Sequence, residues 1–598
     1  MNRLDTVSGL FLDRTERFPD DLIYTYKKEG IWVDVTWREY EEVARETANG
    51  LLSMGMKIGD RVACLSENRW EWYYFAMGAV MARGVVVGIY ATNPSNECEH
   101  VLNHSEARFM LAEDQEQIDK ILPLLEQLQY LEKIIVIGKY EQRDHPKLMS
   151  LEEFHERGRE FGRKNPKLYK KTAKDATKDE AITFVYTSGT TGPPKGAIIT
   201  HENVIGLAEI SLKHYGLELG DTCLEFLPLA HIGGQVVGHY FRLYSRIPAI
   251  IAEGWYDALY NAWEVEPTTF VSTPRMYEKL YNSIQSRVDD ATTIQRRVNE
   301  LAMSIGGRYV KLKESKETIS WRLKIAYALS DFMVFRKFRD ILGGKMKYAT
   351  SGGAPLSAKV VEFFHIIGMP ILEAFGMTET TAWISINSFE RHKIGSVGMP
   401  IPGIDIKIAE DGEILTKGPG NCAGYFKDEE ATRKLIDEDE WLHSGDVGML
   451  DEDGFLIITD RMKDIFITAG GKNVAPGNIE NLMKTSKYIS QCMVYGDKKK
   501  YLVALFTLDE EEITKHARDN RIIFKDTKEL TQKQEIHKLI KKEVAEKNKE
   551  LASVETIKNF FILRDELDED RSEVTATMKV KRKVLSEKYR EQMEALYH

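Results

Sequence analysis

The sequence predicts an α/β fold in which a large N-terminal domain with doubly wound sheets and a helical insert precedes a small mobile α+β C-terminal domain. Three observations support this prediction. In the first 180 residues, short apolar runs alternate with amphipathic helical stretches, which is typical of parallel strands covered by helices on both faces. Residues 281–340 are mainly helical in pattern. After about residue 460, short strand runs mix with a long charged helix, which indicates a separate unit.

The elements of the first part follow one another in a regular order. Each expected strand is a short apolar run, and each expected helix separates two of them. The expected elements are a strand at 62–65, a helix at 70–81, a strand at 85–89, a helix at 97–103, a strand at 109–111, a helix at 115–128 and a strand at 134–137.

The helical insert, at about residues 281–345, differs from its surroundings in charge. Residues 281–340 carry 12 Lys and Arg against 7 Asp and Glu, within a chain of net charge −11. A basic helical surface can lie against anionic lipid, and the alternative is a solvated face of mixed charge. The last part, with short strands at 465–467, 493–495 and 502–506 and a helix at about 531–549, predicts the α+β unit.

Composition excludes several classes of protein. With 43% hydrophobic and 29% charged residues, the chain is a folded protein rather than a disordered one. The acidic balance argues against nucleic-acid binding. No apolar run approaches the roughly 20 residues needed to span a bilayer, and acids at Asp5 and Asp13 interrupt the N-terminus, so no secretory signal is expected. Five scattered cysteines without a CxxC pair indicate neither a zinc motif nor disulfides, and fit a reducing, cytoplasmic setting.

A glycine-rich segment at 186–203 lies between a strand run at 182–185 and a helix that begins near Val204. Glycines allow successive backbone N–H groups to converge on an anion, hydroxyls add donors or ligate a hard cation, and a lysine adds charge. The segment does not match GxxxxGK[ST]. It predicts a polyphosphate loop made of Thr187, Ser188, Gly189, Thr190, Thr191, Gly192, Lys195 and Gly196.

This segment resembles the phosphate loop of the adenylate-forming (AMP-binding) superfamily. The stretches at 59–72, 89–93, 227–235 and 273–281 are similar to the long-chain acyl-CoA synthetases within it, and the resemblance covers nearly the whole chain. It implies an adenylation domain over residues 1–460 and a mobile C-terminal domain over residues 461–598. It also implies Mg²⁺ as cofactor, with ATP and CoA as co-substrates.

Two further segments complete the predicted nucleotide site. Gly-containing turns at 351–356 and 373–380, with Phe375, suit a flat ring, and Glu379 could hold Mg²⁺. Asp446 suits a ribose diol, because a carboxylate accepts from both hydroxyls. The resemblance implies that these segments contact the adenine, ribose and phosphates of ATP. It also implies that Thr190 and Glu379 together ligate Mg²⁺. Beyond the loop, the implied ATP or AMP contacts are Gly353, Ala354, Pro355, Glu373, Ala374, Phe375, Gly376, Thr378, Asp446 and Arg461.

The C-terminal segments carry the remaining predictions. By resemblance, Lys463 is the hinge, Gly470, Gly471 and Lys472 line a CoA channel, and Asp460 stands where the family usually has glycine. Counting from Thr577 places the catalytic lysine at Lys581, with Lys579 as a rival because the usual proline and Gly-Lys are missing. His231, in an LPLAHIGG segment, is expected near the acyl and α-phosphate sites. Gln235 replaces a gating tryptophan of some members.

These features predict a fatty acid–CoA ligase of the cytoplasm. A further prediction is that the basic insert contacts the inner membrane surface. An acyl-adenylate would form from ATP, and CoA would then take the acyl group. Three alternatives stay open: a ligase for a medium-chain or aromatic acid, a catalytically inactive lipid-binding relative, and a peptide-synthetase adenylation domain. The last would need an acid for the substrate ammonium, and residues 228–244 contain none.

Overall fold

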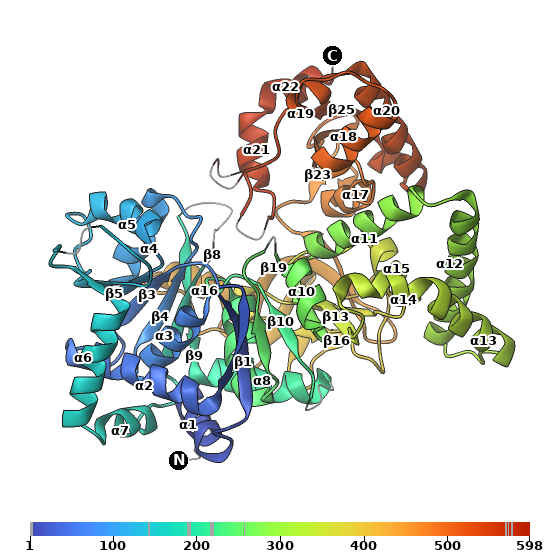
Figure 1. Cartoon of the computed structure of the whole chain (residues 1–598). Coiled ribbons are helices and arrows are strands. Elements are labelled where there is room, and N and C mark those ends of the chain that lie inside the picture. The colour runs from blue at the N-terminus through green and yellow to red at the C-terminus, as the bar shows by residue number, and fades with distance from the viewer. Residues whose placement is uncertain are drawn as a thin grey trace.

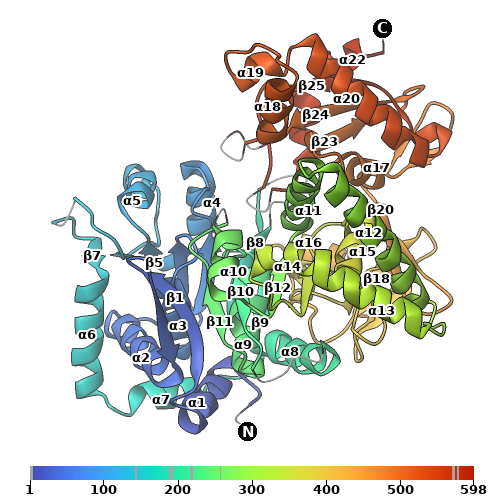
Figure 2. The ribbon, with the colours of Figure 1, turned by 45° about the vertical axis from the view of Figure 1, so that its right-hand side comes forward.

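The computed structural model describes residues 4–141, 144–187, 193–215, 220–255, 257–568, 571, 573–575 and 578–597. Two large sheets and their helices form the N-terminal part, and a smaller part made by the last residues lies over one side of it (Figures 1 and 2). The predicted fold class is confirmed: strands and helices alternate along the first part, and both faces of its sheets are covered.

The first large sheet has seven strands, which are parallel except for the β8–β9 pair. Alternate residues of β3 enter opposite cores: Val62 and Cys64 pack with α3, whereas Ala63 and Leu65 pack with α4 and α5. In spatial order the strands are β7 (Leu148–Ser150), β6 (Lys133–Val136), β5 (Ala107–Ala112), β3 (Arg61–Leu65), β4 (Val85–Ile89), β8 (Ala181–Thr187) and β9 (Lys195–Thr200).

The second large sheet has nine strands, parallel in its centre and antiparallel at both ends. In spatial order they are β16 (Met399–Pro400), β15 (Ser385–Ile386), β14 (Ile371–Phe375), β13 (Tyr348–Ser351), β12 (Thr269–Ser272), β10 (Cys223–Glu225), β11 (Ala249–Ile251), β1 (Leu22–Lys28) and β2 (Ile31–Thr36).

One helix joins the cores of the two large sheets. Every residue of α3 (Trp70–Met81) except Glu71 is buried, and its side chains share one core cluster with residues of both sheets. A helix that is apolar all round needs such a position. Gly78 allows α2 (Trp37–Ser53) to cross closely, because a Cβ there would overlap Thr47.

The other helices of the N-terminal part cover the sheets or connect strands. They are α1 (Val7–Arg17), α4 (Ser95–Ser105), α5 (Gln115–Ile121), α6 (Leu151–Lys164), α7 (Leu168–Lys174), α8 (His201–Tyr215), the π-helix η2 (Gly233–Tyr240), α9 (Phe241–Ser245), α10 (Ala258–Val265) and α15 (Ala358–Ile366). The expected helix at 115–128 was too long: α5 ends at Ile121, because Pro123 lacks the N–H that would continue it, and a 3₁₀ turn, Leu122–Leu124, follows.

The helical insert is present as predicted. It consists of α11 (Pro274–Asp289), α12 (Thr293–Glu314), α13 (Trp321–Ser330), the π-helical turn η3 (Asp331–Phe335) and α14 (Arg336–Arg339). A four-stranded antiparallel sheet follows, with β17 (Asp405–Ile408), β18 (Glu413–Lys417), β19 (Leu442–Leu450) and β20 (Leu456–Arg461), and α16 (Glu429–Leu435) beside it.

The residues after Arg461 form the smaller part, which has two core clusters of its own. Its strands are β21 (Phe466–Ile467), β22 (Asn473–Val474), β23 (Ile489–Tyr495), β24 (Leu502–Leu508) and β25 (Ile557–Ile562). Its helices are α17 (Pro476–Met483), α18 (Glu510–Asp519), α19 (Thr527–Leu530), α20 (Gln534–Lys547), α21 (Arg582–Lys588) and α22 (Arg590–Ala595). Among the residues that the structure describes, no helix combines the length and apolar character needed to cross a bilayer.

Candidate active site

The pairing of β19 with β20 brings two predicted site residues together. Asp446 and Arg461 are opposite each other in this register, and Arg461 Nε lies 3.4 Å from Asp446 Oδ1. Asp446 is only 6% exposed. Burial raises the pKa of its carboxyl, and the positive charges of Arg461 and Lys579 oppose that rise.

Lys579 reaches the same place from the smaller part. An isolated bridge between Val574 and Val580 and the bond from Thr575 N–H to the Lys579 carbonyl, 2.9 Å, form the turn that holds it. Its side chain is exposed to solvent. Partial desolvation by neighbouring groups and the Arg461 charge lower the pKa of Lys579 to about 8, while Asp446 opposes the shift.

Lys581 lies elsewhere in this arrangement. It is the N-cap residue of α21, and its backbone N–H donates to the Glu573 carbonyl over 2.9 Å. Two residues separate it from Lys579, yet Lys579 is the lysine that interacts electrostatically with Asp446. Of the two candidates, Lys579 is therefore the one placed beside the predicted ribose carboxylate.

His231 faces Lys579 from the large part. It precedes the π-helix η2, and its Nδ1 accepts a hydrogen bond from Gly233 N–H over 3.1 Å, so the proton of the neutral ring is on Nε2. Burial and the positive charge of Lys579 lower the pKa of His231 to about 4. Gln235, inside η2, is fully buried and accepts from Thr183 Oγ1 over 2.9 Å.

The predicted phosphate loop is described only at its two ends. Thr187 ends β8 and Lys195 begins β9. Lys195 Nζ lies 3.0 Å from Asp428 Oδ2 and 5.3 Å from the ring centre of Tyr425. The predicted residues Ser188, Gly189, Thr190, Thr191 and Gly192 lie outside the described residues.

Glu379 is held close to the strand that carries Lys195. It lies in a 3₁₀ turn, Thr378–Thr380, is 6% exposed, and its Oε1 accepts from the Tyr425 hydroxyl over 2.5 Å. Tyr425 in turn bridges Ala197 of β9. Burial and the Glu379 charge raise the pKa of Tyr425. Sequence reasoning missed Tyr425, because it stands beside a second aromatic residue, Phe426, in a short GYFKD segment that contains no signal for a contact with Glu379.

The predicted adenine turns lie at the ends of neighbouring strands β13 and β14. Gly353 has a φ of +82°, while Ala354 and Pro355 are exposed and Phe375 is half-buried. A Cβ at Gly376 would overlap the Ala382 carbonyl, so only glycine fits this turn.

Between these turns, Glu373 is the buried carboxyl of β14. Burial raises its pKa to about 8, and a hydrogen bond with the backbone of Gly395 opposes the shift. Ala374, the next residue, is also buried, so of these neighbours Phe375 presents the accessible ring.

The remaining predicted residues lie on exposed turns of the smaller part. Lys463 is in the turn between β20 and β21, and Gly470, Gly471 and Lys472 form the turn between β21 and β22. That turn is closed by the bond from Thr468 N–H to the Lys472 carbonyl, 3.0 Å.

The smaller part lies over α11 in both views (Figures 1 and 2), and polar side-chain contacts join the two. Lys484 Nζ lies 2.9 Å from Glu278 Oε1, and these side chains are only 16% and 3% exposed. Arg275 donates to Ser490 Oγ over 2.6 Å. Lys487 pairs with Asp289 at 2.6 Å, and Lys515 pairs with Asp290.

Two family models match the chain: AMP-binding enzyme over residues 11–426 and AMP-binding enzyme C-terminal domain over residues 463–598. The chain is similar to the long-chain-fatty-acid–CoA ligase FadD15 of Mycobacterium tuberculosis, with 33% identity over 99% of this chain and 97% of that protein. It is also similar to the long-chain-fatty-acid–CoA ligase ACSBG2 of Xenopus laevis, with 30% identity over 99% of this chain and 84% of that protein.

Solved structures share the fold at lower identity. The anthranilate CoA ligase AuaEII in complex with anthranoyl-AMP has a TM-score of 0.72 at 19% identity, covering 98% of this chain and 97% of that one. The A domain of the carboxylic acid reductase from Segniliparus rugosus, in complex with AMP and a co-purified carboxylic acid, has a TM-score of 0.75 at 18% identity, covering 99% and 94%.

Proposed function

Because this chain belongs to the AMP-binding enzyme family, we propose that it is a long-chain fatty acid–CoA ligase. It forms an acyl-adenylate from a fatty acid and ATP, then transfers the acyl group to CoA, and pyrophosphate and AMP leave. The observation that carries the mechanism is the meeting of Asp446 and Arg461 with Lys579 between the two parts of the chain.

In the first step, a fatty carboxylate oxygen bonds to the α-phosphorus of ATP, and the bond from that phosphorus to pyrophosphate breaks. Asp446 accepts from the ribose hydroxyls, which fixes the nucleotide. The Lys579 ammonium stabilises the negative charge on the α-phosphate oxygens, and Nε2–H of His231 donates on the same side. Catalysis of this kind rests on positioning and charge stabilisation, so no covalent enzyme intermediate is needed.

We assign the lysine role to Lys579 rather than Lys581. The count that favours Lys581 starts at Thr577, which lies outside the described residues. The support for Lys579 is its position beside Asp446 and Arg461 and its lowered pKa. A lysine whose pKa is shifted by desolvation and by specific charged neighbours is typical of a functional group.

Glu379 fits a magnesium site. It is a nearly buried carboxylate whose Oε1 already accepts from Tyr425, and hard oxygen ligands are what Mg²⁺ prefers. With Thr190, it would hold the ion against the phosphates. Bound there, Mg²⁺ neutralises phosphate charge. The Tyr425 hydroxyl donates to Oε1 of Glu379. This bond orients the carboxylate and leaves its other oxygen available for the ion.

For the second step, we propose that the smaller domain rotates about Lys463 and withdraws Lys579. The turn of Gly470, Gly471 and Lys472 then lines a channel for CoA. Lys463 lies in an exposed turn directly after β20, where a rotation breaks few contacts. Gly471 has a φ of +73°, and a Cβ built there would meet no atom within 4 Å, which leaves space for pantetheine beside it.

We also propose peripheral membrane contact through the insert. Apolar side chains are exposed along one row of α12 and along another that runs from α13 into η3, including Ile294 (77%), Trp321 (67%) and Phe332 (71%). Arg296, Arg297, Arg322 and Lys324 are nearby in the sequence. Exposed apolar rows with basic neighbours are typical of helices that lie in a lipid surface. We therefore propose that the protein, expected in the cytoplasm, also binds the membrane surface.

Flotation with anionic vesicles tests this contact. Trp321→Ser should reduce the bound fraction, whereas Ile523→Ser, at a site in the smaller part that is 88% exposed, should not. Equal binding of both variants and the wild type would contradict the assignment to the insert.

The catalytic proposal is tested by measuring CoA thioester formation across acids from acetate to long chains, with aromatic acids included. We expect the highest kcat/KM for long-chain acids, with AMP and pyrophosphate released in equal amounts. A preference for an aromatic acid would overturn the substrate assignment alone. No pyrophosphate with any acid would indicate the inactive lipid-binding relative.

A further inference from the structure

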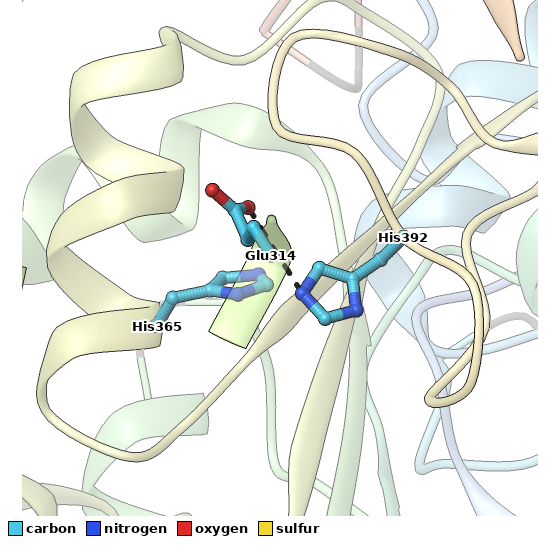
Figure 3. A group of neighbouring side chains, drawn as sticks. All are labelled: Glu314, His365 and His392. Carbon is cyan, nitrogen blue, oxygen red and sulfur yellow. Dashed lines mark ion pairs between the residues drawn. The ribbon is translucent and has the colours of Figure 1, made fainter. Parts of the chain in front are cut away.

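Three potential metal ligands from distant parts of the sequence meet away from Glu379. Glu314 ends α12, His365 lies in α15, and His392 lies between β15 and β16. One ligand atom from each lies within 4.8 Å of the others. Figure 3 shows the carboxylate and the two imidazole rings turned toward one another.

The backbone orients each of these side chains. His365 Nε2 lies 3.1 Å from the Ile371 carbonyl, to which it donates, so its Nδ1 carries the lone pair. His392 has a hydrogen bond with the backbone of Phe389. Metal-binding histidines are usually held in this way, through a bond from one ring nitrogen to a carbonyl or carboxylate.

The described residues supply hydrogen-bond partners for only part of the Glu314 carboxylate. It has a hydrogen bond with the backbone of Ile394, but its Oε1 is buried and has no hydrogen-bond partner among the described residues. His392 Nε2 is 4.0 Å from Oε1, which is too long for a direct hydrogen bond. A buried acceptor without a donor is costly, and a cation between the three groups would remove that cost.

Local charge is compatible with such a cation. Burial lowers the pKa of His365 to about 4, and burial and Lys313 lower the pKa of His392, a direction that favours rings with a free lone pair. Lys313 adds a positive charge, and Glu362, which interacts with Glu314, adds a negative one.

We propose that Glu314, His365 and His392 form a binding site for Zn²⁺ or a similar divalent transition metal, with water in the fourth position. Two imidazoles and one carboxylate suit such a metal, whereas Mg²⁺ and Ca²⁺ prefer oxygen ligands. The metal would link the end of α12 to α15 and to the segment that carries His392. Because Gly395 of that segment contacts Glu373, the link also braces one wall of the nucleotide site.

Zinc titration of the full chain, stripped with a chelator and kept in excess Mg²⁺, tests the site. We expect the protein to take up one equivalent of Zn²⁺ in competition with a chromogenic chelator. Glu314→Gln and His392→Ala should each weaken this binding at least about tenfold. His537→Ala is the matched control, since it removes an imidazole that stacks on Phe560. The five cysteines are all buried and should not compete.

A second readout separates binding from misfolding. Zn²⁺ should raise the Tm of the wild type and of His537→Ala, because a ligand of the folded state stabilises it, but not that of Glu314→Gln. Co²⁺ in the same site should give the strong visible absorption of a four-coordinate ion. If Zn²⁺ affinity and the Tm shift are the same in Glu314→Gln and the wild type, the site does not exist. Should His392→Ala fail to fold, Glu314→Gln still decides.

Discussion

The two parts of the chain meet at two surfaces that use charge differently. At α11, acids and bases neutralise each other in direct pairs, including the nearly buried Glu278–Lys484 pair. At the cleft, Asp446, Arg461 and Lys579 face one another more loosely: the Asp446–Arg461 separation is 3.4 Å, and Lys579 keeps a lowered pKa instead of the raised one that a tight ion pair produces.

This difference assigns the two surfaces to different tasks. Paired charges have little left to offer a ligand, so the α11 surface holds the domain arrangement. Around Asp446, a longer ion pair and a lysine with a shifted pKa are retained in the folded state, which is typical of a site whose partner is a substrate. The experiments below change one surface at a time.

The largest effect is expected for Lys579→Ala, which removes the charge that stabilises the α-phosphate. Loss of one preorganised donor costs about 10²–10³ in rate, so acyl-adenylate formation, measured as pyrophosphate release, should fall by that factor. Thioester formation from synthetic acyl-adenylate and CoA should stay near the wild-type rate.

Lys581→Ala is the matched control, because it removes an identical side chain two residues away. It should leave adenylation within a fewfold of the wild type. If Lys581→Ala abolishes adenylation and Lys579→Ala does not, the lysine assignment is wrong. Equal slowing of both half-reactions by Lys579→Ala would contradict domain rotation.

Asp446→Ala should weaken ATP binding, since the ribose hydroxyls lose a charged acceptor worth about 1.5–3 kcal/mol. Calorimetric Kd should therefore rise by about one to two orders of magnitude. Asp451→Ala is a suitable control, because Asp451 is a carboxylate beyond the same strand that pairs with Lys393. A Kd within twofold of the wild type for Asp446→Ala would remove the ribose role.

The pH dependence of adenylation should show the lowered pKa of Lys579. The ammonium form exists below the pKa, so kcat/KM should fall as pH rises through about 8, by about tenfold per pH unit above it. Lys579→Arg should shift this falling limb to higher pH, because guanidinium stays charged. A limb centred near the ordinary lysine value of about 10.4 would argue against the enclosed cleft.

The smallest effects are expected at α11. Lys484→Met leaves Glu278 without its ion-pair partner. Breaking a buried pair in a rigid core typically costs about 3–5 kcal/mol of stability, but here the domain can shift and admit water. The adenylation rate should therefore fall by less than about tenfold. Lys515→Ala breaks a more exposed ion pair with Asp290. It should lower the free energy of unfolding by about 0–1 kcal/mol. If both variants lose activity as severely as Lys579→Ala, the two surfaces do not have separate tasks.

Local sequence patterns were sufficient for much of the fold. The strand at 62–65 and the helix at 70–81 were predicted within a residue of β3 and α3, because period and apolar content are local properties. The helix at 115–128 was overextended, since its pattern continued past Pro123. Asp446, Arg461 and Glu379 could be proposed as site residues because each lies in a short motif with a fixed order along the chain.

What the sequence by itself determined is therefore the fold class and the family resemblance, together with the segments in which we propose the nucleotide site. Only the tertiary structure places Lys579, and not Lys581, where its charge acts on Asp446. It also brought Tyr425 to Glu379 and gathered Glu314, His365 and His392. Contacts between distant residues depend on how helices and sheets pack, and no local pattern contains that information.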